Sequence, residues 1–387
     1  MALTSTPLKT SLLVTLLAFG PMAACDSSGG SSGSGDGAGA DGFTVVTDGG
    51  GAAQTDASGG PTLDVNSPGD SVSPGPDAGP GPGPGPGPGP GPAPDGPVDT
   101  GCLDGQYTET LPTPDVSIDA VKSSYNVANL NQFILDLLEL RYPTGAYIVN
   151  EALNSNSQLG DCVAYFAYDT SSAEKVIDTL STVVHECGHF LDIELGGWTS
   201  DVFVLTEDLT LQCEGGDKFE YGGNTFVRSE LMNDTFASLR PMCEDGQWGG
   251  CDSYADVYLV GDSGNQGFNT VMEEVVQYIN SLATGYAFHD QSNWTVSQKD
   301  GILTFLWYMQ RYLYLARTQY PETHSFILGN ACYRELILTT WGRAWLYLDV
   351  TDAYPKLGME DDLLKELVMA PELLAEIQSV REAHGCP

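Results

Sequence analysis

The chain has 387 residues and a formal net charge of −37, from 52 acidic and 15 basic side chains. Residues 101–387 hold 42 of the acidic and 14 of the basic groups. A surface of this sign repels phosphate backbones, so we do not expect nucleic acid as a partner. Residues 101–387 are numerous enough to bury a large core and are predicted to form one domain.

The N-terminus has the layout of an export signal. Lys9 precedes an apolar run over residues 12–19, which is too short to span a bilayer, and small residues follow it up to Cys25. The order Ala23-Ala24-Cys25 resembles the lipobox of bacterial lipoproteins, although Met22 stands where that pattern usually has Leu. The resemblance implies a signal peptide over residues 1–24 and a lipid on Cys25. The protein would then be anchored in the cell envelope, at the outer membrane or the cell surface. An ordinary signal peptide is the alternative.

Residues 25–100 consist almost entirely of Gly, Ser, Asp, Ala and Pro. Such a segment cannot bury enough apolar surface to offset its ordering entropy, so we expect it to be disordered. Residues 79–92 are seven Gly-Pro repeats, which favour a semi-extended spacer. The sequence therefore predicts a stalk that carries a folded domain over residues 101–387.

Eight cysteines follow Cys25, and an even number in an exported chain favours disulfide bonds, up to four of them. Cys243 and Cys251 flank a Gly-rich segment and are the first pair that we expect. Cys187 is predicted to be a core or disulfide residue rather than a metal ligand, because it points away from the neighbouring histidines on a helix.

The hydrophobic pattern predicts a predominantly helical α+β fold with a small N-terminal sheet, an active-site helix and a helical C-terminal lobe. Strands are expected at residues 145–149 and 162–168, and an irregular region that covers the cleft at residues 196–268. A capping box at Ser171–Glu174 predicts the start of the active-site helix, which should end near residue 195. The other expected helices cover residues 127–142, 231–239, 269–283, 296–320, 332–348 and 360–384, the last with a break at Pro371.

The active-site helix carries the run His185-Glu186-Cys187-Gly188-His189. Residues four apart share one face of a helix, so both imidazoles can reach one metal ion. Glu186 lies beside them, where its carboxylate can act as a general base towards water that zinc has made acidic. The spacing therefore predicts a zinc site of the hydrolytic kind, against the alternative that both histidines are ordinary core residues.

A catalytic zinc site usually takes three protein ligands. On a continuous helix Glu194 is turned away from His189, and Asp192 is better placed to accept the second N–H of a ligand imidazole than to reach the metal. Glu273 and Glu274, early in the next well-formed helix, are the remaining strong candidates.

Here the sequence resembles the gluzincins, zincin metallopeptidases whose third zinc ligand is a Glu on a helix downstream of H-E-x-x-H. Residues 185–192 match the pattern H-E-x-G-H-x-x-D found in some members, and Glu274-Val275-Val276 matches their ligand Glu with two bulky apolar residues after it. The resemblance implies a zincin-like fold, zinc bound by His185, His189 and Glu274, and Glu186 as general base. It places Glu274 ahead of Glu273 and disfavours a metzincin. An aspzincin, with Asp234 or Asp256 as ligand, stays open.

Zincins also use a Tyr or His to stabilise the oxyanion, and no motif selects one from Tyr221, Tyr258, Tyr286, His289 and His324. The leading hypothesis is a membrane-tethered zinc metalloendopeptidase that acts on protein or peptide substrates. The alternatives are a non-catalytic surface lipoprotein on a zincin scaffold, which binds a partner or the cell wall, and a zinc hydrolase of non-peptide amides.

Overall fold

The computed structural model describes residue 102 and residues 107–155, 159–196, 201–214, 224–243 and 250–386. These residues belong to one compact unit that reaches from Pro92 to the C-terminus. The predicted signal peptide, the lipidation site Cys25 and the stalk over residues 25–100 lie outside the described residues.

The N-terminal part is helical where two strands were expected. It contains α1 (Asp119–Ser123), a 3-10 turn (Val127–Asn129), α2 (Leu130–Arg141), α3 (Pro143–Asn154) and α4 (Cys162–Phe166). The strand predictions at 145–149 and 162–168 are wrong. Pro143 occupies the first position of α3, where no backbone N–H is needed. The Asp161 carboxylate accepts a hydrogen bond from Ala164 N at 3.0 Å and so caps α4.

The helix predicted to carry the active site is α5 (Ala173–Gly196), which ends where predicted and begins one residue later than the capping box indicated. Ser172 accepts from the backbone N–H of Lys175, at 3.3 Å. Ser171 instead donates to the Asp169 carboxylate, at 2.6 Å. Either serine has a hydroxyl oxygen that could cap the helix. The path of the residues before α5 decides that Ser172 does so.

The sheet follows α5 rather than preceding it, which corrects the predicted N-terminal sheet. It is the antiparallel hairpin of β1 (Asp201–Thr206) and β2 (Leu209–Cys213), with Phe203 opposite Leu211. The first five residues of β1 are buried because this strand packs against α5 and α8. A fully buried strand shows no alternation of polar and apolar residues, and this explains why the region looked irregular.

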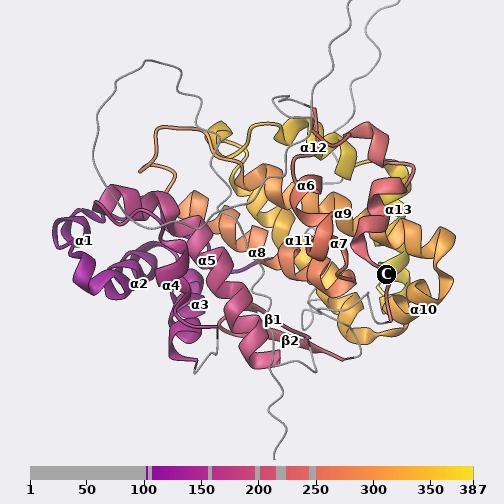
Figure 1. The fold of residues 1–387 in the computed structure, drawn as a ribbon, viewed down its shortest axis with the longest axis horizontal. Coiled ribbons are helices and arrows are strands. Elements are labelled where there is room, and N and C mark those ends of the chain that lie inside the picture. The colour runs from indigo at the N-terminus through magenta and orange to yellow at the C-terminus, as the bar shows by residue number, and fades with distance from the viewer. Residues whose placement is uncertain are drawn as a thin grey trace, which may run out of the picture. The chain divides into compact units, whose positions relative to one another are not determined.

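The C-terminal part is strongly helical, as predicted, and α8 (Phe268–Ala287) lies between the N-terminal helices and the later ones (Figure 1). The segment expected as a helix at 231–239 is two 3-10 turns, Arg228–Asn233 and Ala237–Leu239. An additional helix, α10, was not predicted. The remaining elements are α6 (Ala255–Tyr258), α7 (Gly261–Gly264), α9 (Gln298–Gln319), α10 (Pro321–Gly329), α11 (Ala331–Val350), a 3-10 turn (Pro355–Leu357), α12 (Asp361–Val368) and α13 (Pro371–His384).

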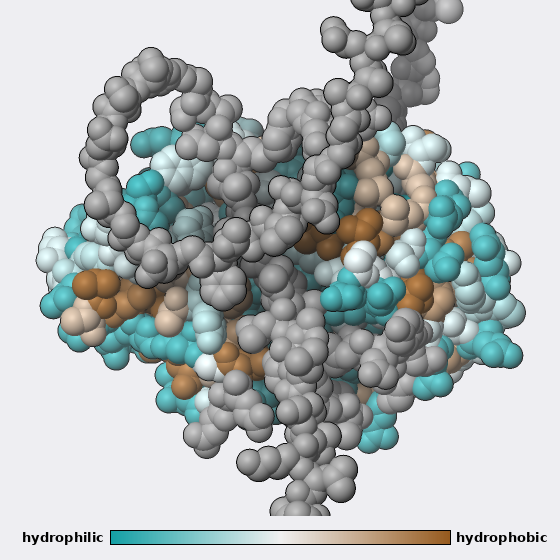
Figure 2. All heavy atoms as spheres, viewed as in Figure 1, coloured by the Kyte–Doolittle hydropathy of each residue, from teal (hydrophilic) through white to brown (hydrophobic). Residues whose placement is uncertain are grey.

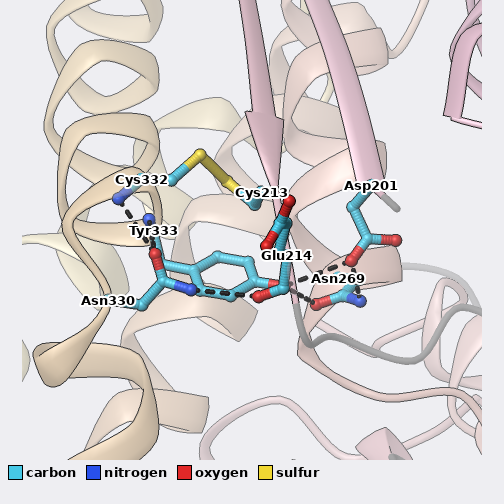
Figure 3. The surroundings of a disulfide bond; sticks show 7 residues. All are labelled: Asp201, Cys213, Glu214, Asn269, Asn330, Cys332 and Tyr333. Carbon is cyan, nitrogen blue, oxygen red and sulfur yellow. Dashed lines mark hydrogen bonds between the residues drawn. A yellow bond between two sulfur atoms is a disulfide. The ribbon is translucent and has the colours of Figure 1, made fainter. Parts of the chain in front are cut away.

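A disulfide and a polar cluster fix the start of α8 (Figure 3). Cys213 of β2 is bonded to Cys332 of α11. Next to this bond the Tyr333 hydroxyl donates to Asn269 Oδ1 at 2.6 Å and contacts the Asp201 carboxylate at 3.2 Å. Asn269 also donates to Asp201. The first turn of α8 is therefore tied to both the hairpin and α11.

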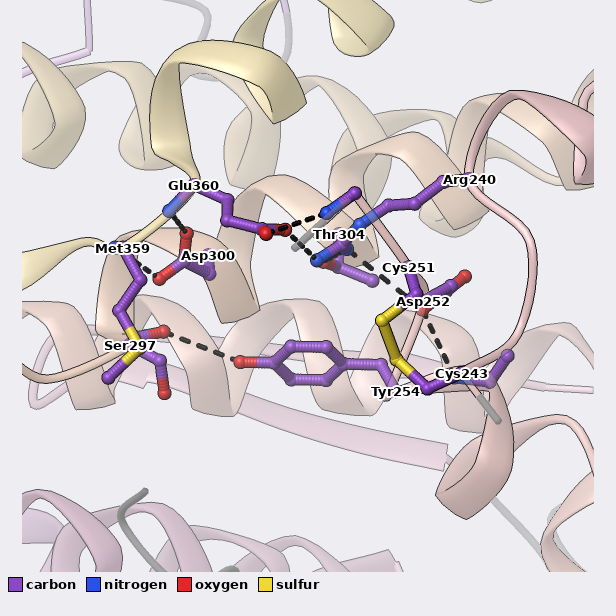
Figure 4. Close-up of polar contacts among 12 residues, drawn as sticks. Arg240, Cys243, Cys251, Asp252, Tyr254, Ser297, Asp300, Thr304, Met359 and Glu360 are labelled. Atoms are coloured by element: carbon purple, nitrogen blue, oxygen red, sulfur yellow. Dashed lines mark hydrogen bonds and ion pairs between the residues drawn. A yellow bond between two sulfur atoms is a disulfide. The ribbon is translucent and has the colours of Figure 1, made fainter. Parts of the chain in front are cut away.

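A second polar cluster holds the segment that leads to Tyr254 and Tyr258 (Figure 4). Arg240 is buried and pairs with Glu360 at 3.0 Å, and the disulfide between Cys243 and Cys251 lies nearby. This is the pair expected first from the sequence. The Tyr254 hydroxyl donates to the carbonyl of Ser297 at 3.4 Å, which joins the segment to the start of α9.

The other two disulfides join Cys102 to Cys386 and Cys162 to Cys187, so all eight cysteines after Cys25 are paired. Four disulfides indicate a non-cytoplasmic protein. The face drawn in Figure 2 is mainly hydrophilic, with apolar side chains in separate patches. Within the described ranges, no helix combines the length and apolar character needed to cross a bilayer.

The disulfide between Cys162 and Cys187 joins α4 to the middle of α5. Its sequence separation is 25 residues, against 8 for Cys243–Cys251. Replacing both cysteines of the longer link by Ala should lower the free energy of unfolding by about 3.5 kcal/mol, and of the shorter one by about 2.5 kcal/mol, from loop-closure entropy. Urea denaturation of the two double variants measures this. An equal or reversed order would contradict the expectation.

Candidate metal centre

The site forms where α5 and α8 pack closely against each other. Gly188 of α5 faces Gln277 of α8 so closely that a Cβ atom at Gly188 would lie 1.9 Å from Gln277 Oε1. The Gln277 amide donates to the Asp192 carboxylate at 2.9 Å, and Asp192 also accepts from Val204 N of β1 at 2.8 Å. These contacts set the register between the histidines of α5 and the glutamates of α8.

Three buried side chains converge across this contact. The Nε2 atoms of His185 and His189 lie 3.1 Å apart. Glu274 Oε2 lies 3.4 Å from the first and 3.6 Å from the second. The three residues form a group that could hold a metal ion, the only such group in the described part of the chain.

The triangle of ligand atoms has the size that a tetrahedral ion requires. Ligands held about 2.0–2.2 Å from a tetrahedral zinc lie about 3.3–3.6 Å from one another. The three observed separations, 3.1, 3.4 and 3.6 Å, are close to this range. Glu274 Oε2 is also buried, and within the described residues its ionic partners are the two imidazole Nε2 atoms, which lie too far away for short hydrogen bonds. The residues present therefore fit a metal ion.

The second nitrogen of each imidazole has its own partner. His189 Nδ1 lies 3.2 Å from Glu273 Oε1, and His185 Nδ1 lies 3.0 Å from Ser281 Oγ. Partners of this kind fix the ring orientation and the tautomer of a ligand histidine. Glu273 thus contacts a candidate ligand from behind. Glu273 and Ser281, rather than Asp192, are the partners of the second imidazole nitrogens.

Electrostatics in the site favour a bound cation. Burial alone would lower the pKa of His189, but Glu274 and Glu273 raise it well above its ordinary value. Burial alone would raise the pKa of Glu274, but His189 and His185 hold it well below its ordinary value. A metal ion would take the place of the proton that these groups otherwise share.

Glu186 is partly exposed, whereas His185, His189 and Glu274 are buried. Burial raises the pKa of the Glu186 carboxyl, the two histidines lower it and Glu274 raises it, with a net upward shift. A raised pKa makes a carboxylate a stronger base near neutral pH.

Two tyrosines and an arginine complete the surroundings. The Tyr278 ring packs edge-on against His185 with 4.7 Å between ring centroids, and its hydroxyl lies 2.9 Å from that of Tyr258. Arg228 is 1% exposed, and its guanidinium carbon lies 5.4 Å from the Tyr258 ring centroid. Burial lowers the pKa of Arg228, while Glu274 and Glu273 oppose that shift, so a positive charge lies within their electrostatic reach.

Tyr278 and Ser281 were not predicted as site residues. Both follow Glu274 at helical spacing, four and seven residues later, and this signal could have identified them. No sequence signal pointed to Arg228.

The other candidate ligands lie elsewhere. Asp234 forms a buried ion pair with Arg311 at 2.8 Å, and Asp256 is exposed on α6. Neither belongs to the metal-binding group. Glu194 is exposed near the end of α5. The aspzincin arrangement therefore has no support in the geometry.

Of the four described candidates for stabilising the oxyanion, Tyr258 is the one whose pKa is raised by the charges of Glu274 and Glu186. Tyr286 and His289 stack on each other at the far end of α8. His324 is on α10, within electrostatic range of Glu376 and Arg317. Tyr221 lies outside the described residues.

Gly188→Ala should separate the two helices, because the new methyl group has no space beside Gln277. We expect a loss of about 1–3 kcal/mol in stability from overpacking, together with weaker metal binding. Thermal unfolding and metal titration measure the two effects. Gly329→Ala is the matched control, since a Cβ atom there meets nothing within 4 Å. Wild-type metal affinity in Gly188→Ala would contradict the close packing.

Glu274 and Glu273 should differ in their effect on metal affinity. Glu274→Gln removes a ligand charge and should weaken binding more than 100-fold, whereas Glu273→Gln changes only the partner of His189 and should cost about 10–100-fold. Competition with a chromophoric chelator gives both constants. A larger loss in Glu273→Gln would mean that Glu273 is the metal ligand and that Glu274 has the supporting role.

No family model, no curated protein and no solved structure matches this chain. The functional assignment therefore depends on the geometry of the described residues and on the resemblance of two short motifs.

Proposed function

We propose that the protein is an exported zinc metallopeptidase of the gluzincin type, tethered to the cell envelope by a lipid on Cys25. The observation that carries this proposal is the closed triangle of His185 Nε2, His189 Nε2 and Glu274 Oε2, with 3.1–3.6 Å between the atoms. Two imidazoles and one carboxylate are a ligand set typical of catalytic zinc. Bound zinc supplies Lewis-acid chemistry, because it polarises a carbonyl and acidifies water.

The side chains around the triangle have separate roles in peptide hydrolysis. Glu186 removes the proton of the attacking water and then delivers it to the leaving nitrogen, a role that suits its partial exposure and raised pKa. Glu273 and Ser281 orient the two ligand imidazoles. Tyr258, close to Glu186 and Glu274, is our candidate for stabilising the oxyanion.

Three protein ligands and an adjacent base distinguish this arrangement from a structural site. Structural zinc is usually enclosed by four protein ligands and has no use for a neighbouring carboxylate. The disulfides and the predicted stalk agree with a domain that works outside the cytoplasm. Neither the disulfides nor the stalk depends on the substrate. A peptidase and a hydrolase of other amides are therefore separated by testing substrates directly.

The test is zinc analysis together with cleavage of a mixed peptide library by the purified chain. We expect one zinc per chain, and we expect Glu186→Gln to keep the zinc while losing about 10²–10⁴-fold in turnover, because only the proton transfer is removed. Glu194→Gln, on an exposed part of the same helix, is the control and should remain active. A folded, zinc-free chain without hydrolytic activity would favour a binding lipoprotein instead.

A further inference from the structure

A cavity of about 250 Å³ opens on the same seam between α5 and α8. Asp178 and Ser181 of α5, Thr284 of α8 and Phe288, which directly follows α8, line it. Asp178 precedes His185 by seven residues, so the two share a face of α5 and lie about 10 Å apart along its axis. The cavity is thus one or two helical turns from the metal centre.

Hydrogen bonds connect the two sites. Ser181 lines the cavity, and its carbonyl accepts from Ser281 Oγ at 3.5 Å. Ser281 in turn contacts His185 Nδ1 at 3.0 Å. The cavity and the metal centre are therefore neighbouring parts of one helix–helix contact.

Two side chains of the cavity, Asp178 and Gln298, offer oxygens that accept no hydrogen bond from the described residues. The Asp178 side chain is 13% exposed, and among the described residues its one ionic partner is Lys175, at 3.9 Å. Burial raises the pKa of Asp178 to about 6, which reflects weak compensation of its charge. Gln298 donates to Ser181 Oγ at 3.2 Å, while its buried Oε1 has no hydrogen-bond partner within the described residues.

The walls of the cavity are aromatic. Trp294, Phe288, Tyr354 and His289 all line it, and faces of aromatic rings attract cations. Lys175 already illustrates the attraction, since its ammonium lies 5.6 Å from the Trp294 ring centroid and is 51% exposed in its side chain. The lining residue Lys356 is exposed and donates to the carbonyl of Asn293. The cavity therefore combines a carboxylate whose one described ionic partner lies 3.9 Å away with rings that favour a positive charge.

We propose that this cavity binds the basic side chain, Arg or Lys, of the peptide substrate, an inference that rests on the proposed peptidase function. A guanidinium supplies N–H donors to Asp178 and Gln298, stacks on Trp294 and displaces Lys175 towards solvent. An extended peptide advances about 3.3 Å per residue, so a distance of about 10 Å places the basic residue within three positions of the cleaved bond.

The experiment measures binding without turnover, in the zinc-loaded full chain that carries Glu186→Gln. Library peptides are paired so that each contains either Arg or citrulline, which has the same shape without the charge, and calorimetry gives both dissociation constants. We expect the Arg peptide to bind about tenfold more tightly, as for one charge-assisted hydrogen bond. Asp178→Asn should abolish this preference. Asp352→Asn, which removes the same charge from an exposed position next to the lining residue Ala353, should keep it.

Equal affinity for the two peptides, or an Arg preference that survives Asp178→Asn, would overturn the inference. If Asp178→Asn does not fold, Trp294→Leu provides the second variant, and an unchanged Arg preference there counts against the proposal. Free arginine that binds as tightly as the peptide would also overturn it, because the site would then serve a free amino acid. If the unsubstituted chain cleaves peptides without preferring Arg, the inference about the cavity is wrong and the proposed peptidase function stands. If the Arg preference depends on Asp178 but no peptide is cleaved, the proposed peptidase function is wrong and the basic-ligand site stands.

Discussion

The centre of the molecule is organised by a buried negative charge. Glu273 and Glu274 lie on α8, which is almost completely buried, and both face histidines of α5. Burying a carboxylate is costly unless a cation or hydrogen bonds compensate it. Arg228 and a divalent ion together carry three positive charges, which would balance Glu186, Glu273 and Glu274. The proposed metal is thus part of the charge balance of the core as well as the reactive group.

The position of these carboxylates depends on polar contacts along α8. A buried helix normally shows apolar residues all round, but α8 also buries Asn269, Gln277, Asn280 and Ser281. Each has a partner on another element: Asn269 on β1, Gln277 and Ser281 on α5, and Asn280 through Tyr142 and Arg343. Because these bonds have direction, they fix the rotation and the axial position of α8 in a way that apolar packing alone would not. Glu274 reaches the histidines through this arrangement.

Sequence reasoning succeeded where a signal was local. The four-residue spacing of His185 and His189 and the long apolar periods of α5, α8, α9 and α11 could be read directly, as could the break at Pro371. It failed where short apolar runs fit a helix and a strand equally well, as at residues 145–149 and 162–168, and at the buried strand β1. Contacts between distant segments gave no signal in the sequence. The roles of Arg228, the cavity at Asp178 and three of the four disulfide pairings depend on how the helices pack.

The stability of the fold gives a reason to regard the metal centre as chemical rather than structural. Small domains recruit structural zinc because their cores are too small to fold alone. Here one large hydrophobic core joins the N-terminal helices to the C-terminal ones, and four disulfides, two of which span more than 100 residues, already constrain the unfolded chain. A buried group of two histidines and two glutamates adds a desolvation cost that such a fold does not need for stability. The chemistry proposed for Glu186 and its neighbours explains this buried group better than a need for stability does.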